Sequence, residues 1–167
     1  MIETTPERPR IQERPAPEDL LLQDLLAYWQ SKIGPDGRLP SRSDIDPAER
    51  THLLPYLFLI DVESGTGPQP AYRVRLLGTA QSVIYNGSFA GQTIDQMMGS
   101  KATLFRHAFD QVRLRRGPVG YAGKLIWWFG KEWIDFESIQ MPLAGDGENV
   151  DMIIGAAVFS IMGRKWG

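Results

Sequence analysis

The chain contains no cysteine and only two histidines, His52 and His107, among its 167 residues. The missing cysteines exclude disulfides, thiolate zinc sites, iron–sulfur clusters, cysteine nucleophiles and any flavin attached through a cysteine. Two imidazoles cannot supply a three-histidine metal site within one chain, so only carboxylates remain as ligands for hard cations. We therefore expect no metal centre.

The sequence also lacks an excess of positive charge and a long apolar run. Its 18 Lys and Arg against 20 Asp and Glu give a net charge of -2, which disfavours binding to nucleic acid or to an anionic membrane. No apolar run approaches the roughly 20 residues of a membrane span, and the polar N-terminus does not resemble a secretory signal. We expect a cytoplasmic protein with no nucleic-acid or membrane partner.

What is present favours one globular domain. Hydrophobic residues make up 43% and charged residues 23% of the chain, while 12 prolines and 17 glycines favour turns and short strands. The predicted organisation is a flexible proline-rich tail at 1–16, a flanking helix at 17–35, a folded domain at 36–163 and a short C-terminal end at 164–167.

Residues 17–33 are predicted to form the first helix, with Pro17 at its start and Gly34-Pro35 after its end. Its apolar stripe is broader than a helix lying on its own domain usually needs. The helix therefore either packs wholly on its own sheet or is shared with a second subunit. We expect a homodimer, and the predicted interface consists of Leu22, Leu25, Leu26, Trp29 and Ile33.

Five segments have the composition of β-strands, namely 57–62, 72–76, 119–128, 131–141 and 150–161. The first two are expected to form a hairpin, and the last three to be joined by loops at Phe129-Gly130 and at AGDGE. The apolar residues of LIWW and MIIGAAVF do not alternate cleanly, which indicates a sheet covered on both faces.

Helical segments separate these strands. A short helix capped by Asp46 precedes the first strand, and Thr93 is expected to cap a short helix before the longest one. That longest helix covers 100–116, and its predicted inward face consists of Leu104, Phe105, Ala108, Phe109 and Val112. The order predicts an α+β domain with a five-stranded antiparallel sheet and helices over one face.

Several strings of the sequence resemble a PAS domain, in particular the bacterial family of short, mostly single-domain PAS-like proteins with an N-terminal flanking helix. They are LLAYWQ, GRLPSRSDIDPAER followed by LLPYLFLIDVE, YRVRLLGT, and MPLAGDGENVDMIIGAAVF, and they span Leu25 to Phe159. The resemblance implies a sheet that cups a small pocket and a sensory or regulatory role. With no second domain expected, the signal would pass to another protein or to a second copy.

Aromatic residues supply candidates for the pocket. We expect a small organic ligand to meet Tyr85, Phe105, Phe109, Trp128 and Trp133. Trp127, Trp128 and Trp133, grouped at the hairpin around Phe129-Gly130, could stack on a planar ligand such as a non-covalent flavin. Alternatively, these aromatic side chains fill the core or a subunit interface, and the protein is an interaction adaptor whose pocket holds only its own side chains.

His107 is the candidate haem ligand, because haem-binding PAS domains use a histidine on the long helix. Its helical position is roughly opposite the predicted inward face, so haem is not expected and the protein should be colourless.

The end of the same helix is basic. Arg113, Arg115 and Arg116 are candidates for binding an acidic partner or the phosphates of a nucleotide messenger. The alternative is an ordinary solvated helix end, where positive charge favours the negative end of the helix dipole.

Motifs for enzymatic chemistry are missing from the sequence. It contains no GxSxG, no phosphate-binding glycine loop with lysine, no HExxH and no dinucleotide fingerprint. Asp135 and Glu137 share one face of a strand, the minimum for a carboxylate pair, although solvent-facing strand residues give the same spacing. We expect a non-enzymatic module, with a small-molecule enzyme of cone-shaped α+β fold as the less favoured alternative.

Overall fold

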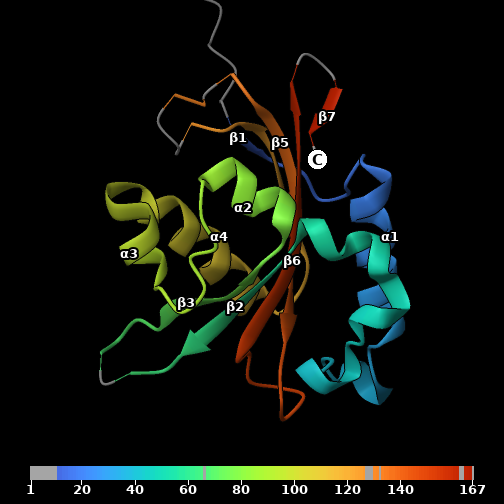
Figure 1. Cartoon of the computed structure of the whole chain (residues 1–167). Helices are drawn as coiled ribbons and strands as arrows, with labels where there is room; N and C mark the ends of the chain where they lie inside the picture. Colours follow the sequence, from blue (N-terminus) through green and yellow to red (C-terminus); the bar gives the residue numbers. More distant parts are fainter. Residues whose placement is uncertain (1–10, 66, 127–129, 132, 162–163, 167) are drawn as a thin grey trace, which may run out of the picture.

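The computed structural model describes residues 11–65, 67–126, 130–131, 133–161 and 164–166. It is built on an antiparallel 7-stranded sheet with the order β1-β4-β5-β6-β2-β3, and β7 also pairs with β6 (Figure 1). The strands are β1 (Ile11–Glu13), β2 (Leu57–Glu63), β3 (Ala71–Leu77), β4 (Val119–Lys124), β5 (Asp135–Leu143), β6 (Met152–Ile161) and β7 (Arg164–Trp166). The five predicted strands are confirmed as β2 to β6.

Helices cover both faces of the sheet, as the uneven alternation predicted (Figure 1). One face carries α1 (Leu20–Ser31) and, after it, the 3-10 segments η1 (Pro35–Gly37), η2 (Arg42–Asp44) and η3 (Pro47–Tyr56). The other face carries α2 (Thr79–Tyr85), α3 (Ile94–Met98), η4 (Gly99–Lys101) and α4 (Ala102–Arg115).

Alternation along β5 divides the buried side chains into two cores. Ile139 and Met141 belong to the core under α1, whereas Phe136 packs in the core under α2 to α4. Successive strand residues point to opposite faces, so Ser138 and Gln140 lie on the same side as Phe136. The strand therefore places two polar side chains on the face opposite α1.

The helix caps follow the sequence closely. Asp46 accepts a hydrogen bond from the N–H of Ala48 at the start of η3, and Thr93 forms a capping box with Gln96 at the start of α3. The first helix is shorter than predicted. It begins at Leu20 because Asp19, and not a residue before Pro17, is its N-cap.

The structure contradicts the predicted flexible tail over residues 11–14, while residues 1–10 of that prediction lie outside the described residues. Residues Ile11–Glu13 form β1 and pair with β4, and the N–H of Arg14 donates to the carbonyl of Gly120 at 2.7 Å. These backbone bonds compensate for the low apolar content of the segment. We call residues 11–19 the N-terminal arm, because they lead from the sheet edge directly into α1.

The hairpin between β4 and β5 is less regular than predicted. β4 ends at Lys124 and β5 begins at Asp135, and the N–H of Leu125 still donates to the carbonyl of Ile134 at 2.9 Å. Trp127, Trp128 and Phe129 lie outside the described residues. Over the described part of the chain, no helix is long and apolar enough to cross a bilayer.

Candidate functional site

A largely apolar cavity of about 410 Å³ lies between the sheet and the helices α2 to α4. This volume is within the range of about 300 to 1,000 Å³ that is usual for small-molecule sites. Its apolar lining includes Phe58, Ile60, Val74, Ile94, Met97, Met98, Phe105, Phe109, Phe136, Ala157 and Phe159.

Two small residues on β6 shape this wall of the cavity: Ala157 lines it, and Gly155 accommodates the ring of Phe58. Gly155 and Ala157 are the neighbours of Gln140 and Ser138 across the β5–β6 pair. A Cβ added to Gly155 would lie 2.2 Å from the ring of Phe58, so glycine allows that ring to lie directly against the strand. A larger residue at Ala157, which lines the cavity, would fill its floor, whereas one at Gly155 would collide with the Phe58 ring.

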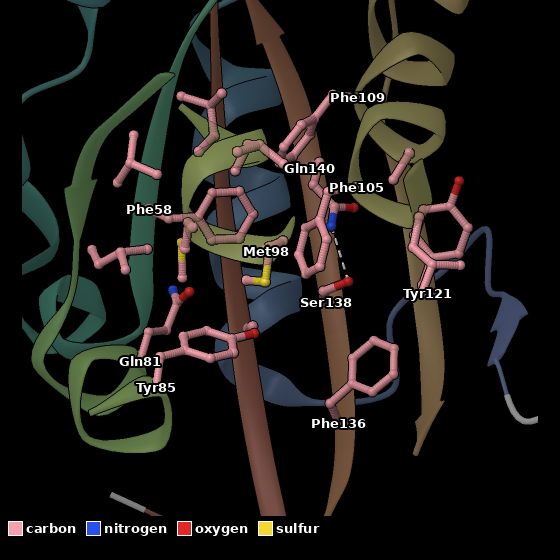
Figure 2. Close-up of a pocket in the computed structure, with 18 of the residues that line it drawn as sticks. Phe58, Gln81, Tyr85, Met98, Phe105, Phe109, Tyr121, Phe136, Ser138 and Gln140 are labelled. Carbon is pink, nitrogen blue, oxygen red and sulfur yellow. Dashed lines mark hydrogen bonds between the residues drawn. The ribbon is translucent and has the colours of Figure 1, made fainter. Parts of the chain in front are cut away.

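Two polar side chains of β5 belong to the cavity wall. The Nε2 atom of Gln140 donates to the hydroxyl of Ser138 at 3.0 Å, as Figure 2 shows. Both residues are buried, with exposed fractions of 6% for Gln140 and 5% for Ser138. Within the described part of the chain, the Oε1 atom of Gln140 has no hydrogen-bond partner, which is unusual for a buried amide.

Aromatic residues from α2 and α4 close the helical side of the cavity. The Tyr85 ring meets Phe159 edge-on at 6.4 Å, and the rings of Phe105 and Phe109 are 6.3 Å apart. The Nε2 atom of Gln81, which also lines the cavity, donates to the carbonyl of Tyr56 at 2.7 Å and so links α2 to η3. These contacts hold the helical wall in place.

The cavity reaches the surface beside α4. Leu104 and His107 are exposed yet line it, and the half-buried Ile11 of β1 and Tyr121 of β4 do so from the sheet edge. Leu104 therefore does not lie on the buried face of α4, where it was predicted. His107 is exposed, as predicted, but it borders the opening and does not point wholly away from the pocket.

The predicted pocket residues have three different outcomes. Tyr85, Phe105 and Phe109 line the cavity. Trp133 does not: its side chain is 54% exposed, and its indole N–H donates to the carbonyl of Gly130 at 2.8 Å. Trp128 lies outside the described residues. Sequence reasoning missed Ser138 and Gln140, although their alternation with apolar residues in β5 places them on the face of Phe136.

Three of the five predicted interface residues are already buried within the chain itself. Leu22, Leu25 and Trp29 pack on the sheet, and the indole N–H of Trp29 donates to the carbonyl of Pro142 at 2.9 Å. This corrects their assignment to a subunit interface, because one sheet face does cover the broad stripe of α1. Leu26 remains half-buried and Ile33 exposed.

Two of the three arginines in the predicted cluster form ion pairs with carboxylates of the same chain. Arg113 contacts Asp110 at 3.4 Å, and Arg115 is paired with Glu13 of the N-terminal arm. The hydrogen bond from Arg115 holds the pKa of the Glu13 carboxyl below its ordinary value. Arg116 is exposed at the C-terminal cap of α4. The three arginines thus do not form one uniform surface.

Asp110 also joins a buried tyrosine. It accepts a hydrogen bond from the hydroxyl of Tyr72, whose exposed fraction is 2%. Burial, and next the hydrogen bond to Asp110, raise the pKa of Tyr72 to about 12. This contact connects α4 to β3.

The two carboxylates of β5 do not form an acid–base pair. Asp135 contacts the ammonium of Lys124 at 2.5 Å. Glu137 is buried and accepts hydrogen bonds from Arg14 and from the backbone N–H groups of Glu18 and Asp19 at 2.8 to 2.9 Å. The Glu137 carboxylate therefore attaches the N-terminal arm to β5. Within the described residues, no group of three or more histidine, aspartate and glutamate side chains could hold a metal ion.

The comparisons with known proteins agree with this architecture. A family model described as PAS domain matches residues 19–158, and the chain belongs to the PAS domain family. Members of this family are in general sensory or signalling modules without enzymatic activity. No curated protein matches the chain.

One solved structure with a similar fold is the crystal structure of a Rhodobacter sphaeroides LOV protein. It is 16% identical, with a TM-score of 0.41, over 72% of this chain and 70% of that one.

Proposed function

We propose that the protein is a non-enzymatic sensory module that binds a small organic ligand in the cavity between the sheet and α4. The observation that carries this proposal is an apolar cavity of about 410 Å³ whose wall contains a buried amide oxygen with no hydrogen-bond partner among the residues that the structure describes. An apolar cavity with a few polar groups is the usual form of a small-molecule site.

The alternative is a protein-interaction adaptor whose pocket is filled by its own side chains. The open volume favours the ligand-binding module, since protein interiors are otherwise packed with few voids larger than a water molecule. An adaptor has no need of the open volume beside Ala157.

The N-terminal arm supports α1 as the output element. Ile11 lines the opening of the cavity, and Arg14, three residues later, is bonded to Glu137. Glu137 also binds the backbone at Asp19, which caps α1. A ligand that displaces Ile11 would thereby act on the start of α1 through a short, bonded segment.

The partners of this module stay predictions. A homodimer would have to use surface beside Leu26 and Ile33, since the other predicted residues of α1 are covered. An acidic partner would meet Arg116 more readily than the paired Arg113 and Arg115. The cytoplasmic location likewise stays a prediction.

Native mass spectrometry and the absorbance spectrum of the freshly purified full chain test the proposal. We expect a mass above that of the polypeptide, lost on denaturation, or else a compound that raises the melting temperature in a screen of fatty acids, flavins, haem and cyclic dinucleotides. A bare chain that is stabilised neither by these compounds nor by a neutral aryl amide would support the adaptor instead.

A further inference from the structure

We propose that the cavity takes a neutral, mainly apolar molecule carrying an amide or lactam group, and that this group binds to Ser138 and Gln140. The inference rests on the proposed function and specifies its ligand class. It starts from the one buried side-chain atom of the described residues that has no hydrogen-bond partner, Oε1 of Gln140.

The position of Gln140 explains why the chain itself does not satisfy this oxygen. Its neighbours across the sheet are Val119 on β4 and Gly155 on β6, and neither has a polar side chain. On its own strand, Ser138 takes the hydrogen bond from Nε2. A buried amide without a partner is destabilising, so a polar group in this place is expected to have a use.

Ser138 and Gln140 together offer one unpaired acceptor and at least one donor. None of the described residues accepts a hydrogen bond from the Ser138 hydroxyl, while Gln140 presents an unpaired oxygen. If the amide of Gln140 is turned around, its oxygen accepts from Ser138 and its two N–H donors become unpaired. In either orientation, a ligand group with both a donor and an acceptor completes the pair.

An amide or lactam edge is such a group. The oxygen of Gln140 has almost no exposed surface, so the ligand meets it after a rotation about the terminal side-chain torsion. That torsion is soft in glutamine.

The remainder of the lining determines the charge of the ligand. Among the described residues, no lysine, arginine, aspartate or glutamate lines the cavity, and His107 stands at its exposed opening. A carboxylate or ammonium group placed near Gln140 would lose its hydration without gaining a counter-charge. The ligand is therefore neutral at its buried end.

The aromatic rings around Ser138 and Gln140 determine the shape of the ligand. Figure 2 shows Phe58, Phe105, Phe109 and Phe136 around the hydrogen-bonded pair of Gln140 and Ser138. Aromatic walls favour a flat ring that stacks on them or meets their edges. An aryl amide with a short apolar tail fits this combination.

Calorimetric titration of the full chain with three matched probes tests the inference. The probes are para-pentylbenzamide, para-pentylacetophenone, which accepts but does not donate, and para-pentylbenzoate, which is charged at neutral pH. We expect the amide to bind about tenfold or more tightly than the ketone, and the benzoate to bind most weakly.

Two variants test whether Ser138 and Gln140 bind the probes and cause the preference for the amide over the ketone. Gln140→Leu removes the acceptor for the amide N–H, so it should reduce the preference for the amide over the ketone while ketone affinity is kept. Ser138→Ala removes the hydroxyl that donates to either carbonyl, so it should weaken both probes. Met98→Leu is the control, because it changes the cavity wall at nearly constant volume and should leave the preference intact. The side-chain amide signal of Gln140 in an NMR spectrum should also shift on binding of the benzamide.

The outcomes separate the inference from the proposed function. Equal binding of amide and ketone, unchanged in both variants, would overturn the inference and leave the ligand-binding cavity standing. Absence of binding for every probe to the wild-type chain would overturn both.

Discussion

The guanidinium of Arg14 lies 2.9 Å from the carboxylate of Glu137, across 123 residues of sequence. The same carboxylate accepts the backbone N–H groups of Glu18 and Asp19. One buried side chain of β5 therefore attaches the N-terminal arm, and with it the start of α1, to the centre of the sheet.

Replacement of Glu137 should destabilise the fold. We expect Glu137→Gln to lower the free energy of unfolding by about 2–4 kcal/mol, because Arg14 and two backbone donors lose a charged acceptor. Urea denaturation measures this change. Glu63→Gln is the control: Glu63 pairs with Arg73 at the surface, so we expect a loss of about 0–1 kcal/mol. Equal small losses in both variants would contradict the role of Glu137.

Removal of the N-terminal arm should also destabilise the protein. Deletion of residues 1–14 removes β1, the pairing of Arg115 with Glu13 and the ion pair of Arg14. We expect the melting temperature to fall by about 5 °C or more. An unchanged melting temperature, as a tail without contacts requires, would show that the arm contributes nothing.

Trp29 should behave as a core residue. We expect Trp29→Ala to lower the free energy of unfolding by about 3–5 kcal/mol. The indole is buried between α1 and the sheet, and its N–H donates to the carbonyl of Pro142. Leu20→Ala on the same helix is the control, because Leu20 is 77% exposed. Urea denaturation of both variants at several protein concentrations measures these losses. A loss that depends on concentration would indicate that Trp29 serves a subunit interface after all.

Tyr72 should make the fold sensitive to alkaline pH. Its pKa is about 12 in the folded state against an ordinary 10.0, so the folded state holds the phenol proton more tightly than the unfolded state. The resulting stability is fully present below pH 10 and is lost as the pH rises towards 12. It amounts to roughly 2–3 kcal/mol.

Tyr72→Phe isolates this effect, because it removes the titrating group. We expect the variant to lose less stability than the wild type between pH 9 and about 11, measured by urea denaturation at each pH. Parallel losses in the two proteins would assign the alkaline sensitivity to other groups.

Local sequence signals predicted much of the sheet and its caps. Alternation along residues 72–76 fixed one face of β3, and the Asp46-Pro47 and Thr93 signals located the starts of η3 and α3. Such signals work where the residues of one segment decide its conformation. The breadth of the apolar stripe on α1 did not reveal what covers it. A sheet face and a second subunit both require apolar residues on the covered side of the helix.

The features that carry function depend on distant residues and were harder to predict. β1 has a single apolar residue, Ile11, and forms because β4 offers its edge. Glu137 appeared to be a solvent-facing carboxylate because its partners lie more than 115 residues away. The cavity lies over Ala157, and Gly155 admits the Phe58 ring that forms part of its wall, which only the packing of the whole domain reveals.

The most direct test of the account fills the cavity. Ala157 lines it and pairs with Ser138 on the sheet, so Ala157→Leu places a larger side chain beside the polar pair. Val158→Ile is the control on the opposite face of β6. The measurement is calorimetric titration of both variants with para-pentylbenzamide, after NMR spectra confirm that each is folded. The account predicts that Ala157→Leu abolishes binding while Val158→Ile binds as the wild type does; undiminished binding to a folded Ala157→Leu variant would contradict it.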